Sequence, residues 1–467
     1  MQTCCMTDRP LRLSGLAPIL IASLLTGFTA AAVAQTSPPH DRQMLPPHAA
    51  LQSDALQAAA APSSQRHGDP LDQRGIYRLD GLDAGLPQND LAPLRKILKK
   101  ADMVGLGETI HTSGGYYAMK HRLVRYLVEE MGFRAFAMET PWPYALTTAQ
   151  YVATCEGSVN DAMFGIFAVW ASTETAGLLT YMCTWNQQHP NDPITFFGFD
   201  VQQPEIDGPA LITHLQGLGL SGTDPRITGL RRCDGVVDFA YPNQITDADN
   251  QACLTALDAI DALLTQLDPS DAVQRNRADV EWAKIRSIGV RSWQGSEYYF
   301  NTDYPRAFTF RDRGMATVLQ RIRTLLVGSQ KTAVWAHNFH IGKGGSEFEE
   351  LGFTVMGDWL SRDMGHRYAA LALAAAHVEV EWPWISLCGP VDVHPDSAEA
   401  RLQQLGEPYL LVDLDFHGTN PAHPPFLDPE EPILIGDDWY IPREHYDGLV
   451  YLENSPSMTP FWIPCNN

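Results

Sequence analysis

Residues Met103 to His111 read MVGLGETIH and contain the clearest indication of the fold class. The first four residues, Met103 to Leu106, form a short apolar run of the kind that makes a buried strand. Glu108 and His111 follow almost directly behind it. In open α/β sheets, ligands bind outside the carboxyl ends of the strands. This stretch therefore predicts a strand that carries two polar groups into a site.

Three more apolar runs are each followed by polar residues in the same way. These runs are Ala135–Met138 before Glu139, Ile194–Phe199 before Asp200, and Thr332–Ala336 before His337, Asn338 and His340. The carboxyl ends of parallel strands meet at one edge of a sheet. We therefore expect two glutamates, one aspartate and three histidines to converge there.

Helical patterns separate these runs. In Tyr116–Met131 the apolar residues recur on one face, and Gly132 follows where a helix commonly ends. Alternating strands and helices predict an α/β fold, with a mainly parallel sheet flanked by helices. Residues of about 205–325 are mostly helical in pattern, which predicts a helical subdomain. Further strands are expected at Tyr368–Leu373, Tyr409–Leu414 and Leu449–Leu452.

The first 70 residues indicate export. Residues 1–34 combine Arg9 and Arg12, an apolar stretch and an Ala32-Val33-Ala34 cleavage pattern, so they read as a signal peptide. Residues 35–70 are rich in Pro, Ala, Gln, Ser and His, which predicts a disordered linker. The folded domain is then 71–467. We expect a periplasmic or secreted protein with no stable membrane insertion after cleavage.

Net charge and cysteine count indicate which kinds of partner and crosslink to expect. The formal net charge of the 467 residues is −22, which argues against nucleic acid, because binding phosphates requires clustered Lys and Arg. Six cysteines follow the signal segment, an even number that suggests disulfides in an exported chain. The spacing leaves 15 pairings open. The short-range scheme is Cys155–Cys183, Cys233–Cys253 and Cys388–Cys465.

The polar groups behind the strands suit acid–base chemistry. Glu108 and His111 are three residues apart, so a carboxylate can fix the imidazole tautomer and make His111 a better base. His337 and His340 have the same spacing, and they could stabilise an oxyanion or ligate a metal. The sequence holds no G-x-S-x-G, no Walker A motif and no H-E-x-x-H. Neither a nucleophile elbow nor a standard metal signature is therefore present.

These segments resemble the erythromycin esterase family. The run Gly107 to His111 resembles its G-E-x-x-H signature, and the resemblance continues over about Gly75 to Pro464 in an ordered set of motifs. It implies hydrolysis of a lactone or carboxylic ester by an activated water, without a cofactor. It also implies that His111 is the general base, beside Glu108, with Glu139, His337 and His340 completing the pocket. The residues expected to bind substrate are Lys120, Asp200, Asn338, Arg311 and Trp170.

The resemblance is imperfect next to His111. The family commonly has a glycine there and an acidic residue a few positions later, whereas this chain reads Thr112-Ser113-Gly114-Gly115. We therefore expect a small-molecule ester or lactone substrate without naming a macrolide. Two alternatives stay open: a metal-dependent hydrolase or peptidase on the same fold, and a non-catalytic envelope protein with a binding or biosynthetic role.

Overall fold

The computed structural model describes residues 74–236, 245–267, 274–383, 386–416, 426–428, 431–436 and 438–461. The predicted signal peptide (1–34) and linker (35–70) lie outside these residues. So does Cys465, and with it the predicted Cys388–Cys465 pairing. No helix among the described residues has both the length and the apolar character needed to cross a membrane.

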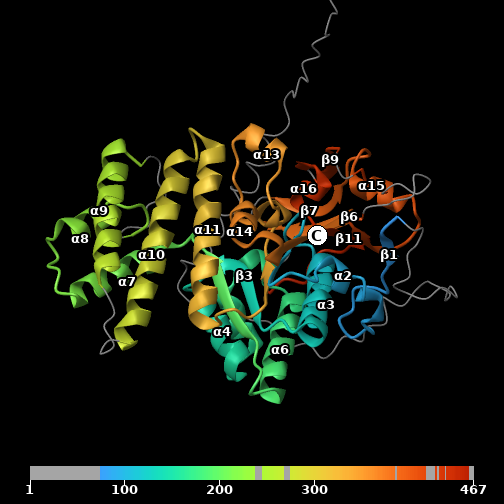
Figure 1. Cartoon of the computed structure of the whole chain (residues 1–467), viewed down its shortest axis with the longest axis horizontal. Helices are drawn as coiled ribbons and strands as arrows, with labels where there is room; N and C mark the ends of the chain where they lie inside the picture. Colours follow the sequence, from blue (N-terminus) through green and yellow to red (C-terminus); the bar gives the residue numbers. More distant parts are fainter. Residues whose placement is uncertain are drawn as a thin grey trace, which may run out of the picture. The chain divides into compact units, whose positions relative to one another are not determined.

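A nine-stranded sheet forms the centre of the fold (Figure 1). Its strands run in the order β1-β8-β11-β6-β2-β5-β3-β4, and β7 also pairs with β6. The bounds are β1 Ile76–Arg78, β2 Met103–Leu106, β3 Ala135–Pro141, β4 Thr195–Asp200, β5 Thr332–Trp335, β6 Tyr368–Trp382, β7 Leu387–Asp392, β8 Tyr409–Asp413 and β11 Gly448–Ser455. A separate hairpin joins β9 (Ile433–Ile435) to β10 (Asp438–Tyr440).

The sheet is mainly parallel, as the sequence predicts. Every pairing along β11-β6-β2-β5-β3-β4 is parallel. Beyond β11 the pairing changes direction: β8 runs antiparallel to β11, and β1 antiparallel to β8. The central strands β2, β3 and β5 are buried along their whole length, which is why they read as continuous apolar runs rather than alternating ones.

Helices follow most of the strands. Their bounds are α2 Leu94–Ile97, α3 Gly114–Met131, α4 Ala145–Thr154, α5 Val159–Ala162, α6 Thr173–Gln188, α7 Pro204–Gly217, α8 Pro225–Leu230, α9 Asp247–Gln266, α10 Gln274–Tyr299, α11 Tyr304–Leu326, α12 Asn338–Ile341, α13 Ser346–Leu351, α14 Met356–Met364, α15 Ala398–Gln403 and α16 Pro442–His445. Short 3₁₀ turns lie at Asn89–Leu91, Met163–Gly165, Ala168–Trp170 and Gly365–Arg367. Gly132 ends α3 at φ 75°, a conformation that glycine adopts without strain, as the sequence indicates.

Between β4 and β5 the described residues form helices alone, from α7 to α11. Helix α8 contacts α9, α9 contacts α10, and α10 contacts α11 (Figure 1). Apolar residues of α7 to α10 share a buried core of their own, which includes Leu211, Leu257 and Val290. The predicted Cys233–Cys253 disulfide lies within this core.

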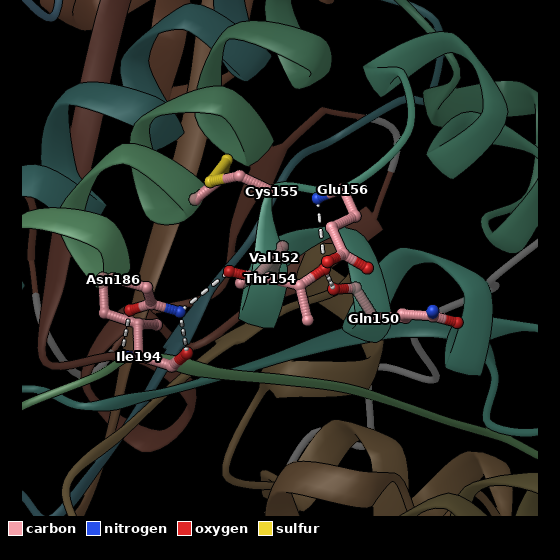
Figure 2. The surroundings of a disulfide bond; sticks show 8 residues. Gln150, Val152, Thr154, Cys155, Glu156, Asn186 and Ile194 are labelled. Carbon is pink, nitrogen blue, oxygen red and sulfur yellow. Dashed lines mark hydrogen bonds between the residues drawn. A yellow bond between two sulfur atoms is a disulfide. The ribbon is translucent and has the colours of Figure 1, made fainter. Parts of the chain in front are cut away.

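The second disulfide, Cys155–Cys183, joins the end of α4 to α6, again as predicted (Figure 2). Beside it, the buried amide of Asn186 donates to the carbonyls of Val152 (2.9 Å) and Ile194 (2.8 Å). Its oxygen accepts from the Ile194 backbone at 2.6 Å. One side chain thereby ties α4 and α6 to the start of β4.

Two parts of the sheet differ from the sequence prediction. Strand β6 continues nine residues beyond the expected Leu373, through an alanine-rich run and then an alternation in which Val378 and Val380 are buried while Glu379 is exposed. Strands β1 and β7 were not expected at all. Strand β1, at the end of the sheet, has three residues, too few for an apolar pattern. Strand β7, which pairs with β6, reads LCGPVD, and its Gly389 and Pro390 are atypical of a strand.

Candidate active site

The sheet register brings the predicted groups together. Leu106 of β2 pairs with Trp335 of β5, and Trp335 pairs with Met138 of β3. The residues that follow these three, Glu108, His337 and Glu139, therefore emerge side by side at one edge. Asp200 ends the neighbouring strand β4, which pairs with β3. The predicted convergence of four strand ends is thus present.

Glu108 is fully buried and holds three donors. Its Oε1 accepts from Nε1 of Trp170 at 2.9 Å and lies 3.0 Å from Nδ1 of His111, while Oε2 accepts from Nζ of Lys120. Burial alone would raise the pKa of Glu108. Lys120 and His111 outweigh burial and lower this pKa to about 2. The carboxylate is therefore ionised at neutral pH.

The contact with Glu108 determines the tautomer of His111. A carboxylate only accepts hydrogen bonds, so Nδ1 of His111 carries the proton. In the neutral ring Nε2 then bears the lone pair. The residue is 1% exposed, and its ring lies edge-on to those of Trp170 and His337, with ring centres 5.1 and 5.3 Å away. Its position is therefore fixed on several sides.

Glu108, His111, Trp170 and Lys120 form the first of two clusters in the site, and Lys120 is its buried cation. It lies on α3, contacts Glu108, and places Nζ 3.3 Å from the Ala336 carbonyl and 4.3 Å from the centre of the Trp335 ring. Burial lowers the pKa of Lys120 to about 8, against the attraction of Glu108. In this structure Lys120 contacts the carboxylate that orients His111.

A second cluster centres on Arg311 of α11. Its Nη2 donates to Oδ2 of Asp200 at 2.6 Å and to Oε1 of Glu139 at 2.9 Å. All three side chains are buried. Burial would lower the pKa of Arg311, but the two carboxylates raise it, so the guanidinium stays charged. Arg311 thereby holds the ends of β3 and β4 together.

His340 lies in the second cluster between acidic groups. Its Nδ1 is 2.8 Å from Oδ1 of Asp312, and its Nε2 is 3.0 Å from Nη1 of Arg311 and 3.4 Å from Oε1 of Glu139. Burial lowers the pKa of His340, but Asp312 and Glu139 outweigh it and raise the pKa. The neutral ring can accept from Arg311, whereas the protonated ring directs Nε2–H toward Glu139.

His337 lies between the clusters, and both of its ring nitrogens bind backbone. Nε2 donates to the Thr109 carbonyl at 2.8 Å, and Nδ1 accepts from the Phe339 amide at 3.2 Å. A ring that donates at one nitrogen and accepts at the other is neutral. Burial lowers the pKa of His337 to about 3, in agreement. Its own amide donates to Oε2 of Glu139 at 3.0 Å, which links the two clusters.

Asn338 contacts the sheet backbone. Its amide donates to the Leu373 carbonyl at 3.0 Å and accepts from the Leu373 amide at 3.3 Å. A Cβ on Gly107 would lie 1.9 Å from Oδ1 of Asn338, so only glycine fits there. The amide nitrogen and the amide oxygen of Asn338 therefore both bind the backbone of β6. The structure therefore gives Asn338 a scaffolding position beside the expected substrate groups.

Sequence reasoning missed two neighbours of the site. Asp312, which contacts His340, directly follows Arg311 in the sequence, and that adjacency was the available signal. Tyr117 is buried beside Trp335 and binds the backbone next to His111. No group of three or more His, Cys, Asp or Glu among the described residues is arranged to hold a metal ion.

The fold and the site define an α/β protein with two buried acid–histidine clusters at the carboxyl edge of its sheet. The chain belongs to the erythromycin esterase family, whose model matches residues 128–455. That match begins after Glu108, His111 and Lys120. A longer similarity, 26% identity over 433 residues, relates 86% of this chain to 94% of YbfO of Bacillus subtilis (strain 168), a hydrolase by name. Erythromycin esterase type II of Escherichia coli is 27% identical over 115 residues, 24% of this chain and 26% of that protein.

Solved structures share the fold. A mutant of the erythromycin esterase EreC in its open conformation has a TM-score of 0.61 at 17% identity, over 81% of this chain and 97% of that one. A Bacillus cereus protein has a TM-score of 0.67 at 21% identity, covering 83% and 97%. A protein described as a succinoglycan biosynthesis protein has a TM-score of 0.65 at 20% identity, covering 83% and 96%. At these identities the likeness concerns the fold.

Proposed function

We propose that this protein hydrolyses a carboxylic ester or lactone with a water molecule that His111 activates, and that it acts after export. Membership of the erythromycin esterase family supports ester hydrolysis. The observation that carries the mechanism is the 3.0 Å contact between Nδ1 of His111 and the ionised Glu108. With the proton held on Nδ1, the neutral imidazole carries its lone pair on Nε2, and this is the nitrogen that we assign as the general base.

In the proposed reaction, Nε2 of His111 takes a proton from water while the water oxygen bonds to the carbonyl carbon. The resulting imidazolium is stabilised by Glu108, just as a carboxylate stabilises the imidazolium of other acid–histidine pairs. Collapse of the tetrahedral intermediate breaks the bond to the leaving alcohol, which must receive a proton. The products are a carboxylic acid and an alcohol, joined in one molecule when the substrate is a lactone.

The geometry favours His340 over His337 for protonating the leaving group. Both nitrogens of His337 are bound to backbone, so the proton on Nε2 is not available without breaking the contact with Thr109. His340 instead lies between Asp312 and Glu139, which raise its pKa and favour the protonated ring. We assign His337 the role of positioning His111 and the Glu139 carboxylate.

Arg311 and Lys120 would organise the charges of the pocket. Arg311 fixes Glu139 and Asp200, and Lys120 keeps Glu108 ionised. Trp170 supplies a donor to Glu108 and an aromatic wall beside His111. These contacts support preorganisation of the site, so the substrate would meet groups already in place.

The test is hydrolysis of a panel of neutral esters and lactones, macrocyclic lactones included, by the full chain after removal of any signal segment. Mass spectrometry would detect the gain of one water in each product, with and without a chelator. We expect turnover that the chelator does not change. Activity that disappears with the chelator and returns with added metal would replace the proposal with a metal-dependent hydrolase, and absence of turnover on the whole panel would contradict it.

A further inference from the structure

Thr112, the residue directly after His111, has an unusual backbone conformation. Its φ is 64°, in the left-handed region that β-branched residues rarely adopt. Among the described residues, only Cys155 and Ser386 share a positive φ without being glycine. Strain of this kind persists only where the surroundings hold it, and it occurs often at functional sites.

Three distant segments hold Thr112 in place. Its amide donates to Oη of Tyr117 at 2.6 Å, and that hydroxyl in turn donates to the Val169 carbonyl at 2.8 Å. Its carbonyl accepts from the Met458 amide at 3.0 Å, beyond the end of β11. Its own hydroxyl accepts from the Glu381 amide of β6 at 3.1 Å. The residue is fully buried, so these bonds replace water completely.

The turn at Thr112 separates His111 from α3. Helix α3 begins at Gly114, only three residues after His111, and the same helix carries Lys120 into the site. The chain must therefore change direction between the imidazole and the helix. The left-handed residue provides this change, which lets His111 reach Glu108 while Lys120 reaches the same carboxylate from α3.

Glycine, which the family commonly has at this position, would adopt this conformation without strain, so the threonine is a feature of this chain that folding alone does not explain. What threonine adds is the hydroxyl bond to β6 and a stiffer backbone. We propose that Thr112 is a positioning residue for His111, which locks the imidazole against Glu108. The kinetic test of this role rests on the proposed hydrolysis. A second test, the NMR signal of the proton on Nδ1 of His111, needs no substrate.

The experiment compares Thr112→Gly with Thr112→Ser and with Ser386→Gly, which relieves a positive φ away from the site. Two quantities are measured in the full chain: kcat and KM on an ester, and the low-field proton NMR signal of His111 Nδ1–H, assigned with His111→Gln. We expect Thr112→Gly to keep its melting temperature, to lose about 10-fold to 100-fold in kcat with little change in KM, and to lose the signal. Thr112→Ser and Ser386→Gly should retain both.

Wild-type kcat and signal in Thr112→Gly would overturn the proposal. A fall in kcat with an unchanged His111 signal would overturn it too, because the imidazole would then still be in place. If the wild type cleaves no ester but the signal depends on Thr112 as expected, the proposed function fails while the positioning role stands.

Discussion

Nδ1 of His111 lies 3.0 Å from Oε1 of Glu108, and both side chains are excluded from solvent. Glu108 also binds Lys120 and Trp170, so a single carboxylate fixes a base, a cation and an aromatic ring. The site is therefore a preorganised set of charges, and each charge can be removed separately.

Removal of the Glu108 charge should damage both folding and turnover. Glu108→Gln keeps the shape of the side chain but leaves Lys120 buried without a counter-ion, which costs about 3–5 kcal/mol of unfolding free energy. Turnover should fall by about 100-fold or more, because His111 loses the group that stabilises its charged form. Urea unfolding and kcat/KM measure the two effects.

The double variant Glu108→Gln/Lys120→Met separates the effect on stability from the effect on turnover. It removes both charges, so stability should recover by most of the lost amount while turnover stays low. Recovery of turnover together with stability would show that Glu108 acts on folding alone.

The fall of activity at alkaline pH should follow the deprotonation of Lys120. Its pKa in the folded chain is about 8, below the ordinary value of 10.5, so the unfolded chain binds more protons between these values. The free energy of unfolding should therefore rise with pH over this window. Activity should fall over the same window, because ionised Glu108 loses its cation. Lys120→Arg, which stays charged, should move this fall to higher pH. An unchanged alkaline fall in that variant would assign it to another group.

Arg311 should be far more sensitive to substitution than its neighbour two residues on. Arg311→Met leaves Asp200 and Glu139 buried without their shared cation, which costs about 3–5 kcal/mol. Arg313 is exposed on the same helix, with its guanidinium 5.3 Å from the centre of the Trp359 ring, and Arg313→Met should change stability by about 1 kcal/mol or less. Urea denaturation of the two variants checks the contrast. Equal effects would mean that Arg311 is not the structural link between β3 and β4.

The helical part should tolerate loss of its disulfide without loss of chemistry. Cys233→Ala/Cys253→Ala opens a crosslink across 20 residues, and it should lower stability by about 2–4 kcal/mol. The bond lies in a core formed by α7 to α10, and its cysteines are not among the residues of the two acid–histidine clusters. We therefore expect kcat at 25 °C to stay close to wild type. A large loss of kcat in a folded variant would show that this core controls the site.

The sequence predicts the convergence of the site because strand ends are visible in it. Continuous apolar runs mark β2, β3 and β5, and parallel pairing then brings Glu108, Glu139 and His337 to one edge. The even number of cysteines predicts disulfides but does not determine their pairing. The short-range pairs Cys155–Cys183 and Cys233–Cys253 were a choice among 15 pairings, and the structure contains both.

What the sequence does not reveal is which atom each side chain uses. His337 reads as a second imidazole for the substrate, yet the Thr109 carbonyl and the Phe339 amide occupy its nitrogens, and only three-dimensional coordinates place those groups. Asp312 is missed because its contact with His340 depends on how α11 lies against α12, the short helix that carries His340. Strand β6 is underestimated because alanine has no strong strand preference.

Whether His111 is the general base is tested by the activity of His111→Gln on an ester that the wild type cleaves. The control is His121→Gln, a half-buried histidine of α3 whose ring centre lies 5.8 Å from that of Tyr181. We predict a loss of about 100-fold to 10,000-fold in kcat/KM for His111→Gln and a change within a few-fold for His121→Gln. Near-normal turnover by a folded His111→Gln protein would contradict this assignment.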